Sequence, residues 1–454
     1  MTTEQTAPSH LAGNFAPVPD EATVTELQVT GAVPPELTGW YLRNGPNPQQ
    51  ADSAHWFTGD GMVHGIRLDG GRAVSYRNRW VRTPPFETGA TIYGADGSVN
   101  LANGRANTHV IRHAGRTLAL METCLPYELS HETGSELDTI AVYDFGGTLH
   151  TPMTAHPKTC PVTGELHFFG YGGLSAPYLT YHRADATGEL TVSRPVDVPG
   201  HTMMHDFHLT RNHVIFMDLP VVFSMERAVD PKGGMPFVWS DTYGARLGVL
   251  RRDDPHGAIR WFDIAPCYVF HSLNAHEEDE GRRLVLFGMR YPKLEDGAAV
   301  SLPAHLWRWT VDLTTGTVRE EQLDDRPGEF PRVDDRLAGL DADFGHVTAT
   351  PLPGLVHSDP AAARSAIHRY DLRKNEASSH WFAPGREAGE AVFVPADDRP
   401  GGPGWLMTFV YDAATDRSDL VILDADRLSA DPVATVHLPR RVPAGFHGSW
   451  LPDH

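Results

Sequence analysis

The chain has 454 residues, of which 41% are hydrophobic and 21% charged, so it carries enough apolar material for a large buried core and does not have the composition of a disordered chain. Its 38 Lys and Arg residues against 58 Asp and Glu residues give a net charge of −20, and no dense basic stretch offers a phosphate-binding patch, which argues against a nucleic-acid partner. The first residues lack the basic region and apolar run of a secretory signal, and no apolar stretch approaches the roughly 20 residues that span a bilayer, so we expect a cytoplasmic protein.

Seven segments have the pattern of a β-hairpin, with two alternating strands joined by a turn rich in Asp, Gly, Thr or Asn. In chain order they begin at His64, Ile140, Leu179, Arg246, His305, Ile367 and Leu420. More apolar strands begin at Thr117, Glu165, His213 and Arg283. This pattern predicts an all-β fold, with a seven-bladed β-propeller over residues 1–454 as a single domain favoured over a pair of β-sandwiches.

Two segments fall outside this pattern. Residues up to about 30 are expected to form an N-terminal extension. Residues 220–244 form a long insertion with eight large apolar side chains and no clear strand. In a propeller such insertions gather on one face, so we expect a loop or helix cap there. An apolar insertion of this size would line a tunnel for an apolar substrate or contact a membrane surface peripherally, although ordinary packing of the cap explains each side chain equally well.

Four histidines have similar local settings, each at a predicted strand end beside small or apolar residues: His156, His205, His271 and His447. Their intervals of 49, 66 and 176 residues exclude a common helix or hairpin. Equivalent inner strands of different blades would bring them to a shared axis, where four neutral imidazoles would hold a first-row divalent metal. On spacing alone, buried histidines of the core are the more common alternative.

Eight stretches resemble, in the same order, motifs of the carotenoid cleavage oxygenases. They are YLRNGPNP (41–48), HWFTGDGMVHGI (55–66), ANTHVIRHAGRTLALME (106–122), MMHDFHLTRNHVIFMDLP (203–220), FHSLNAHEE (270–278), EFPRVDDR (329–336), EAVFVP (390–395) and FHGSW (446–450). The resemblance implies a seven-bladed propeller with a cap and one non-haem Fe²⁺ per chain, held by His156, His205, His271 and His447. It also implies an oxygenase that adds both atoms of O2 across one carbon–carbon double bond to give two carbonyl products.

The same resemblance assigns three glutamates as partners of the histidines, pairing Glu122 with His205, Glu329 with His271 and Glu390 with His447, and leaving His156 without a carboxylate. An imidazole that binds a metal keeps its tautomer and orientation by donating its other N–H, most effectively to a carboxylate. Without the resemblance, each glutamate would more simply be a surface carboxylate.

The substrate expectation depends on positions where this chain departs from one branch of the family. Stilbene-cleaving members hold a phenolic hydroxyl with a Lys before the first glutamate and a Tyr after the HGIRL strand, where this chain has Met121 and Trp80. This difference favours an apolar carotenoid or apocarotenoid over a stilbene or phenylpropene. We expect the substrate to contact Phe57, Trp80, Thr108, Met121 and Phe223. A non-enzymatic propeller scaffold is the remaining alternative, and it leaves the histidines and glutamates unexplained.

Overall fold

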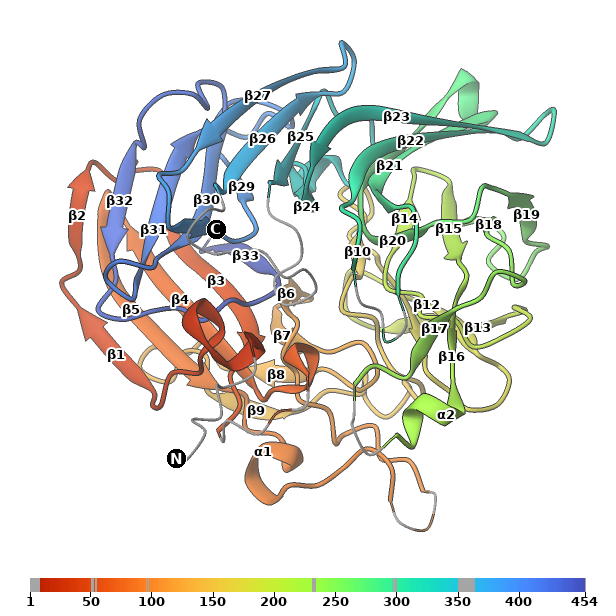
Figure 1. Cartoon of the computed structure of the whole chain (residues 1–454), viewed down its shortest axis with the longest axis horizontal. Helices are drawn as coiled ribbons and strands as arrows, with labels where there is room; N and C mark the ends of the chain where they lie inside the picture. Colours follow the sequence, from red (N-terminus) through yellow and green to blue (C-terminus); the bar gives the residue numbers. More distant parts are fainter. Residues whose placement is uncertain are drawn as a thin grey trace, which may run out of the picture.

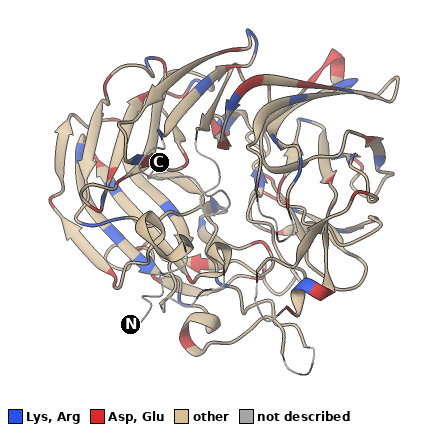
Figure 2. Ribbon diagram, in the orientation of Figure 1, with Lys and Arg blue, Asp and Glu red and all other residues tan. Residues whose placement is uncertain are grey.

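Seven antiparallel sheets form the seven blades of a β-propeller around a central axis (Figure 1). The computed structural model describes residues 9–49, 53, 55–94, 96, 98–230, 234–295, 297, 300–349 and 364–453. The predicted all-β propeller is therefore confirmed. Acidic and basic residues are both distributed around the ring (Figure 2).

Blades 1 to 4 follow one another along the chain. Blade 1 contains β1 (Ala22–Thr25), β3 (Gly39–Pro46), β4 (Gly61–Asp69), β5 (Arg72–Trp80) and β33 (Gly448–Pro452). Blade 2 contains β6 (His109–His113), β7 (Arg116–Leu120), β8 (Tyr127–Leu129) and β9 (Thr139–Val142). Blade 3 contains β10 (Lys158–Thr159), β11 (Leu166–Tyr171), β12 (Leu179–Ala184) and β13 (Leu190–Val196). Blade 4 contains β14 (Phe207–Leu209), β15 (His213–Asp218), β18 (Arg246–Arg251) and β19 (Arg260–Asp263).

Blades 5 to 7 complete the ring. Blade 5 contains β20 (Tyr268–Glu278), β21 (Arg283–Tyr291), β22 (His305–Asp312) and β23 (Thr317–Pro327). Blade 6 contains β24 (Glu329–Arg332), β25 (Phe344–Thr348), β26 (Ala366–Asp371) and β27 (Glu376–Trp381). Blade 7 contains β2 (Gln28–Gly31), β28 (Arg386–Ala388), β29 (Val392–Pro395), β30 (Gly404–Asp412), β31 (Arg417–Asp424) and β32 (Ala434–His437).

Helices are few and short. In the part of the chain that the structure describes, the α-helices are α1 (Pro84–Thr88) and α2 (Met225–Ala228), and the 3₁₀ turns are η1 (Ser9–Leu11), η2 (Gly13–Phe15), η3 (Trp56–Thr58), η4 (Asp279–Gly281) and η5 (Asp335–Leu337). Among the described residues no helix is long and apolar enough to cross a membrane.

Inner and outer strands of a blade differ in burial. Every residue of β11 and of β15 is buried, because these strands pack against neighbouring blades on both faces. Most residues of the outer strand β23 are exposed or only partly buried. In the sequence, strands that are covered on both faces appear as continuous apolar runs. In half-exposed strands, apolar and polar residues alternate.

Both ends of the chain close the ring. The C-terminal strand β33 pairs with β3 of blade 1, from Gly39 opposite Pro452 to Arg43 opposite Gly448. The N-terminal strand β2 pairs with β32 of blade 7, and β1 pairs with β5 of blade 1. Residues 22–31 are therefore parts of blades, and the extension expected up to about residue 30 is shorter than the sequence suggested.

Two further expectations need correction. Six of the seven predicted hairpins form, but the one starting at Ile140 does not: its first strand is β9, which pairs with β8, and the chain then runs on to an isolated bridge between Met153 and Cys124. The insertion 220–244 does contain strands, since β16 (Val221–Phe223) and β17 (Phe237–Trp239) form a two-stranded hairpin. We call β16 and β17 the cap hairpin.

Candidate metal centre

Each of the four histidines belongs to a different blade and lies at, or just before, its innermost strand. His156 precedes β10 and His205 precedes β14, each by two residues. His271 is the fourth residue of β20, and His447 immediately precedes β33. The propeller therefore brings together at its axis residues that are up to 291 positions apart in the sequence.

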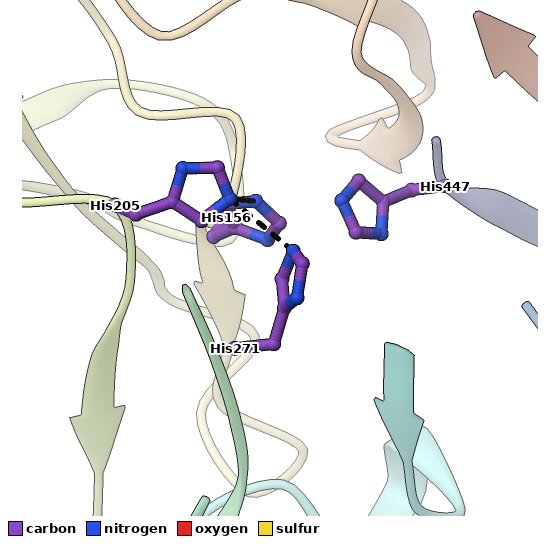
Figure 3. A group of neighbouring side chains, drawn as sticks. All are labelled: His156, His205, His271 and His447. Carbon is purple, nitrogen blue, oxygen red and sulfur yellow. Dashed lines mark hydrogen bonds between the residues drawn. The ribbon is translucent and has the colours of Figure 1, made fainter. Parts of the chain in front are cut away.

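The four side chains converge on one point (Figure 3). One nitrogen of each ring lies within 4.8 Å of the corresponding nitrogens of the others. Nε2 of His205 is 3.0 Å from Nε2 of His156 and 3.2 Å from Nε2 of His271. A metal about 2.1 Å from each nitrogen would hold neighbouring nitrogens about 3 Å apart, so the spacing is that of one coordination sphere.

Three carboxylates face the other ring nitrogens. Nδ1 of His205 contacts Oε1 of Glu122. Nδ1 of His271 lies 2.5 Å from Oε2 of Glu329, and Nδ1 of His447 lies 2.9 Å from Oε1 of Glu390. A carboxylate only accepts, so each of these rings donates from Nδ1 and turns the lone pair of Nε2 inward. The three Nε2 lone pairs therefore face one another with no proton between them. A cation bound at their centre fits this arrangement of donors.

The glutamates are held by different groups. Glu390 is buried, and its Oε2 accepts from the Gly448 backbone N–H at 2.6 Å and from Nη1 of Arg332 at 3.1 Å. Burial raises the pKa of Glu390, but Arg332 and His447 lower it more, so the net pKa is below its ordinary value and the group is ionised at neutral pH. Oε2 of Glu122 instead accepts from the hydroxyl of Tyr171.

The charges of the centre complement a divalent cation. The three glutamates place carboxylates directly behind the histidine rings, which favours a divalent cation in this buried place. Burial is the main reason that the pKa of His156 lies well below its usual range, and the neighbouring histidines lower this pKa further. The ring is therefore neutral at pH 7, as a metal ligand must be.

Phe330 shows how the backbone supports the site. It has φ of 52°, in the left-handed region that a side chain rarely adopts, and this turn lets its N–H donate to Oε2 of Glu329 at 2.7 Å. Its ring also stacks on His271, with centroids 5.4 Å apart. Sequence reasoning missed this residue, although its position directly after Glu329 in EFPR is a usable signal.

An apolar cavity of about 250 Å³ opens onto the metal centre. Four residues predicted to contact substrate line it, namely Phe57, Thr108, Met121 and Phe223. His205, His271 and His447 contribute to its wall, together with Glu122. Met235 and Phe237 line it too, as expected for the insertion 220–244. Apolar and aromatic residues that sequence reasoning missed also line it: Ile92, Tyr93, Tyr171, Met203, Phe270, Phe330 and Phe446. Two of these, Phe270 and Phe446, directly precede ligand candidates, and that adjacency could have identified them.

Trp80 is the exception, and its assignment to the substrate cavity is wrong. Its indole N–H donates to the backbone oxygen of Asn47 at 2.8 Å, and its ring packs against Phe86 in a small cluster with Val18 and Met62. The side chain is thereby fixed in the core of blade 1. Trp80 therefore gives no argument against a stilbene substrate, whereas Met121 still does.

Comparison with known proteins places the chain in a family. The family model described as retinal pigment epithelial membrane protein matches residues 15–452. A carotenoid cleavage oxygenase of Mycobacterium tuberculosis is 38% identical over 505 aligned residues that cover both chains completely. The solved structure of a Pseudomonas brassicacearum lignostilbene dioxygenase has a TM-score of 0.86 and 29% identity, and covers 99% of each chain. A cobalt-substituted apocarotenoid oxygenase of Synechocystis has a TM-score of 0.81 and 29% identity, and covers 96% of this chain and 97% of its own.

The chain therefore belongs to the family of the retinal pigment epithelial membrane protein and the carotenoid cleavage oxygenases. It is an enzyme of the dioxygenase class. The resemblance found in the eight sequence motifs is confirmed over nearly the whole chain.

Proposed function

We propose that the protein is a non-haem Fe²⁺ oxygenase that cleaves one carbon–carbon double bond of a carotenoid or apocarotenoid with O2 and gives two carbonyl products. The observation that carries this proposal is the convergence of four histidine nitrogens, three of their rings oriented by carboxylates, at the wall of an apolar cavity. Imidazole nitrogens suit a first-row metal such as iron.

His156, His205, His271 and His447 would hold the ion through Nε2, with Glu122, Glu329 and Glu390 keeping three of the rings in the required tautomer. Bound ferrous iron supplies the activation of O2, which a closed-shell alkene does not achieve by itself. The apolar cavity that His205, His271 and His447 help to line would receive the substrate beside the bound ion. Both oxygen atoms enter the products, one at each carbon of the broken bond.

The chain's own contribution is binding, orientation and exclusion of water. Phe270, Phe330 and Phe446 surround the histidines, while Phe57 and Met121 lie along the same cavity. Such walls take an extended apolar chain out of water and hold one of its double bonds against the metal, which replaces a chance encounter by a fixed geometry. They also exclude bulk water from the cavity beside the histidines.

The polyene is favoured over a phenolic stilbene because the cavity has Met121 where the stilbene branch carries a lysine. An apolar thioether cannot anchor a phenol as an ammonium does. The names of relatives that cleave carotenoids support this choice. The stilbene alternative has one observation in its favour, which is the 0.86 TM-score with the Pseudomonas brassicacearum lignostilbene dioxygenase.

Oxygen uptake separates these substrates. Reconstituted enzyme should consume one O2 for each apocarotenal cleaved, with both labelled atoms of ¹⁸O2 found in the two carbonyl products. A hydroxystilbene at the same concentration should be turned over more slowly. Faster cleavage of the hydroxystilbene would reverse the substrate assignment and leave the metal centre unaffected.

We also propose that the cap meets a membrane surface, where such substrates dissolve and where a cytoplasmic enzyme would collect them. Exposed apolar side chains lie on the cavity wall, at Tyr93, and between the two strands of the cap hairpin, at Met225 and Val229. Flotation with vesicles of neutral lipid tests this contact, since a net charge of −20 disfavours anionic lipid. Met225→Ser should weaken flotation, and equal flotation of variant and wild type would contradict the assignment.

A further inference from the structure

Asp206 directly follows the ligand candidate His205, and its side chain is only 1% exposed. Its Oδ1 lies 2.9 Å from Nζ of Lys158 and accepts the backbone N–H of Phe207 at 2.7 Å. Its Oδ2 accepts from the backbone N–H of Ser272 at 2.8 Å and from the Ser272 hydroxyl at 2.6 Å. One buried carboxylate therefore joins groups from three blades.

The partners of Asp206 lie beside other histidines of the metal centre. Lys158 is two residues after His156 and begins β10 of blade 3. Ser272 directly follows His271 within β20 of blade 5, while Asp206 itself directly precedes β14 of blade 4. Because β10, β14 and β20 belong to three different sheets, contacts other than a strand ladder must set how they lie relative to one another. The Asp206 carboxylate provides such contacts to all three.

The strand that carries His271 is irregular at this point. In β20 the pairing with β21 shifts register between Val269 and Ser272, and again between Ser272 and Asn274. An irregularity of this kind interrupts the regular ladder and re-aims a side chain. The N–H of Ser272 donates to Asp206, so the carboxylate stabilises the bend in β20 from which His271 points toward the other histidines.

Stability alone does not explain a buried ion pair at this place. A carboxylate that is removed from water is unfavourable unless it is paired and hydrogen-bonded. Replacing a buried ion pair by uncharged, well-packed side chains often leaves the stability of a protein unchanged or raises it. The contacts of Asp206 fall instead beside His156, His205 and His271, whose Nε2 atoms are spaced by 3.0 and 3.2 Å.

We propose that Asp206 is a positioning residue of the metal centre. Through Lys158 and Ser272 it holds three segments that carry ligand candidates at the separation that one metal ion requires. The three glutamates orient individual imidazole rings, whereas Asp206 sets the relative positions of the backbones that carry the rings. The inference rests on the proposed metal centre and adds to it a residue that acts through the strands.

The test removes the ion pair without leaving an unpaired charge. In the double variant Lys158→Met, Asp206→Asn both side chains keep roughly their size, and the amide oxygen still accepts from Ser272. Co²⁺ is the probe, because its visible absorption bands report the number and arrangement of its ligands. The variant should bind Co²⁺ about 10-fold more weakly than the wild type, and the absorption bands should shift. Ser272→Ala, which leaves the ion pair in place, should shift them less.

Glu165 and Arg252 provide the matched control. They also form an ion pair between blades 3 and 4, with Nη2 of Arg252 2.9 Å from Oε2 of Glu165, and neither residue lines the cavity. The double variant Glu165→Gln, Arg252→Met should keep the wild-type affinity for Co²⁺ and the wild-type spectrum. Thermal unfolding of the metal-free proteins reports stability separately. Lower stability of the Lys158→Met, Asp206→Asn variant with an unchanged Co²⁺ spectrum would show a purely structural role and refute the proposal.

The same measurements separate this proposal from the proposed function. A wild-type Co²⁺ spectrum and affinity in Lys158→Met, Asp206→Asn would overturn the positioning role and leave the metal centre intact. An altered spectrum in this variant, together with an iron-loaded wild type that cleaves no apocarotenal, would sustain the positioning role and contradict the oxygenase activity. A wild type that takes up no Co²⁺ would overturn both.

Discussion

The inward direction of the Nε2 atoms depends on groups that never touch the metal. Nδ1 of His271 donates to Oε2 of Glu329, 2.5 Å away. The same carboxylate oxygen accepts from the backbone N–H of Phe330, which holds Glu329 in place. Glu390 depends in the same way on Arg332. The ligand candidates and their glutamates could be found in the sequence through motif resemblance, but Arg332 and Tyr171 could not, since their partners are set by tertiary contacts.

Replacing Glu329 by Gln tests this dependence. The amide is neutral and no longer fixes the His271 tautomer as strongly, so iron affinity should fall about 10- to 100-fold. Anaerobic Fe²⁺ titration measures the affinity. Glu128→Gln is the control, because Glu128 pairs with Arg116 in blade 2, away from the cavity lining. Equal affinities in both variants would argue against the role of Glu329.

Met121 tests the apolar character of the cavity. Met121→Lys would bury an ammonium without a partner, and turnover of an apocarotenal should fall at least 10-fold. Met121→Leu conserves volume and polarity and should stay close to the wild type. Steady-state kinetics of both variants gives the comparison, and undiminished turnover by Met121→Lys would show that the substrate does not pass this residue.

At the scale of secondary-structure elements, turn residues and the alternation of apolar and polar residues located most of the hairpins. The DLTTGT turn after His305 is correctly placed because Asp312 caps it through the N–H groups of Thr314 and Thr315. The segment after Ile140 has a similar turn, but no second strand follows, because the chain there leads directly to His156. The hairpin β16–β17 is the opposite case, because it forms although the sequence did not predict it. Each of its strands has only three residues, too few to show an alternating pattern.

Glu277 in β20 joins blade 5 to blade 4. It accepts from His213, Thr210 and Asn212, and although its burial raises the pKa, these bonds lower it to about 2. A depressed folded-state pKa gives stability that is present above the unfolded value of about 4.5 and is lost as pH falls toward 2.

Urea unfolding between pH 7 and pH 2.5 measures this contribution. Glu277→Gln should lower the free energy of unfolding at pH 7 by about 1–3 kcal/mol and flatten its decline below pH 4.5. The adjacent Glu278, an exposed residue paired with Arg283, gives the control variant Glu278→Gln. Identical pH profiles for the wild type and Glu277→Gln would contradict the link.

At the scale of the whole molecule, the ring makes the metal centre depend on both ends of the chain. His447 is placed by β33, which pairs with β3 near the other terminus, whereas His156, His205 and His271 come from three consecutive blades. The number of blades followed from hairpin counting, although one of the seven hairpins does not form, and motif resemblance, not spacing, identified the four of the 25 histidines that meet. A metal that binds only the closed ring must stabilise it by mass action.

Iron content after anaerobic reconstitution, measured together with O2-dependent cleavage of an apocarotenal, tests the central claim most directly. The four-histidine centre predicts close to one iron per chain, with activity proportional to iron content and both lost in His271→Ala. A folded protein that takes up no iron, or that cleaves the substrate equally well without it, would contradict the account.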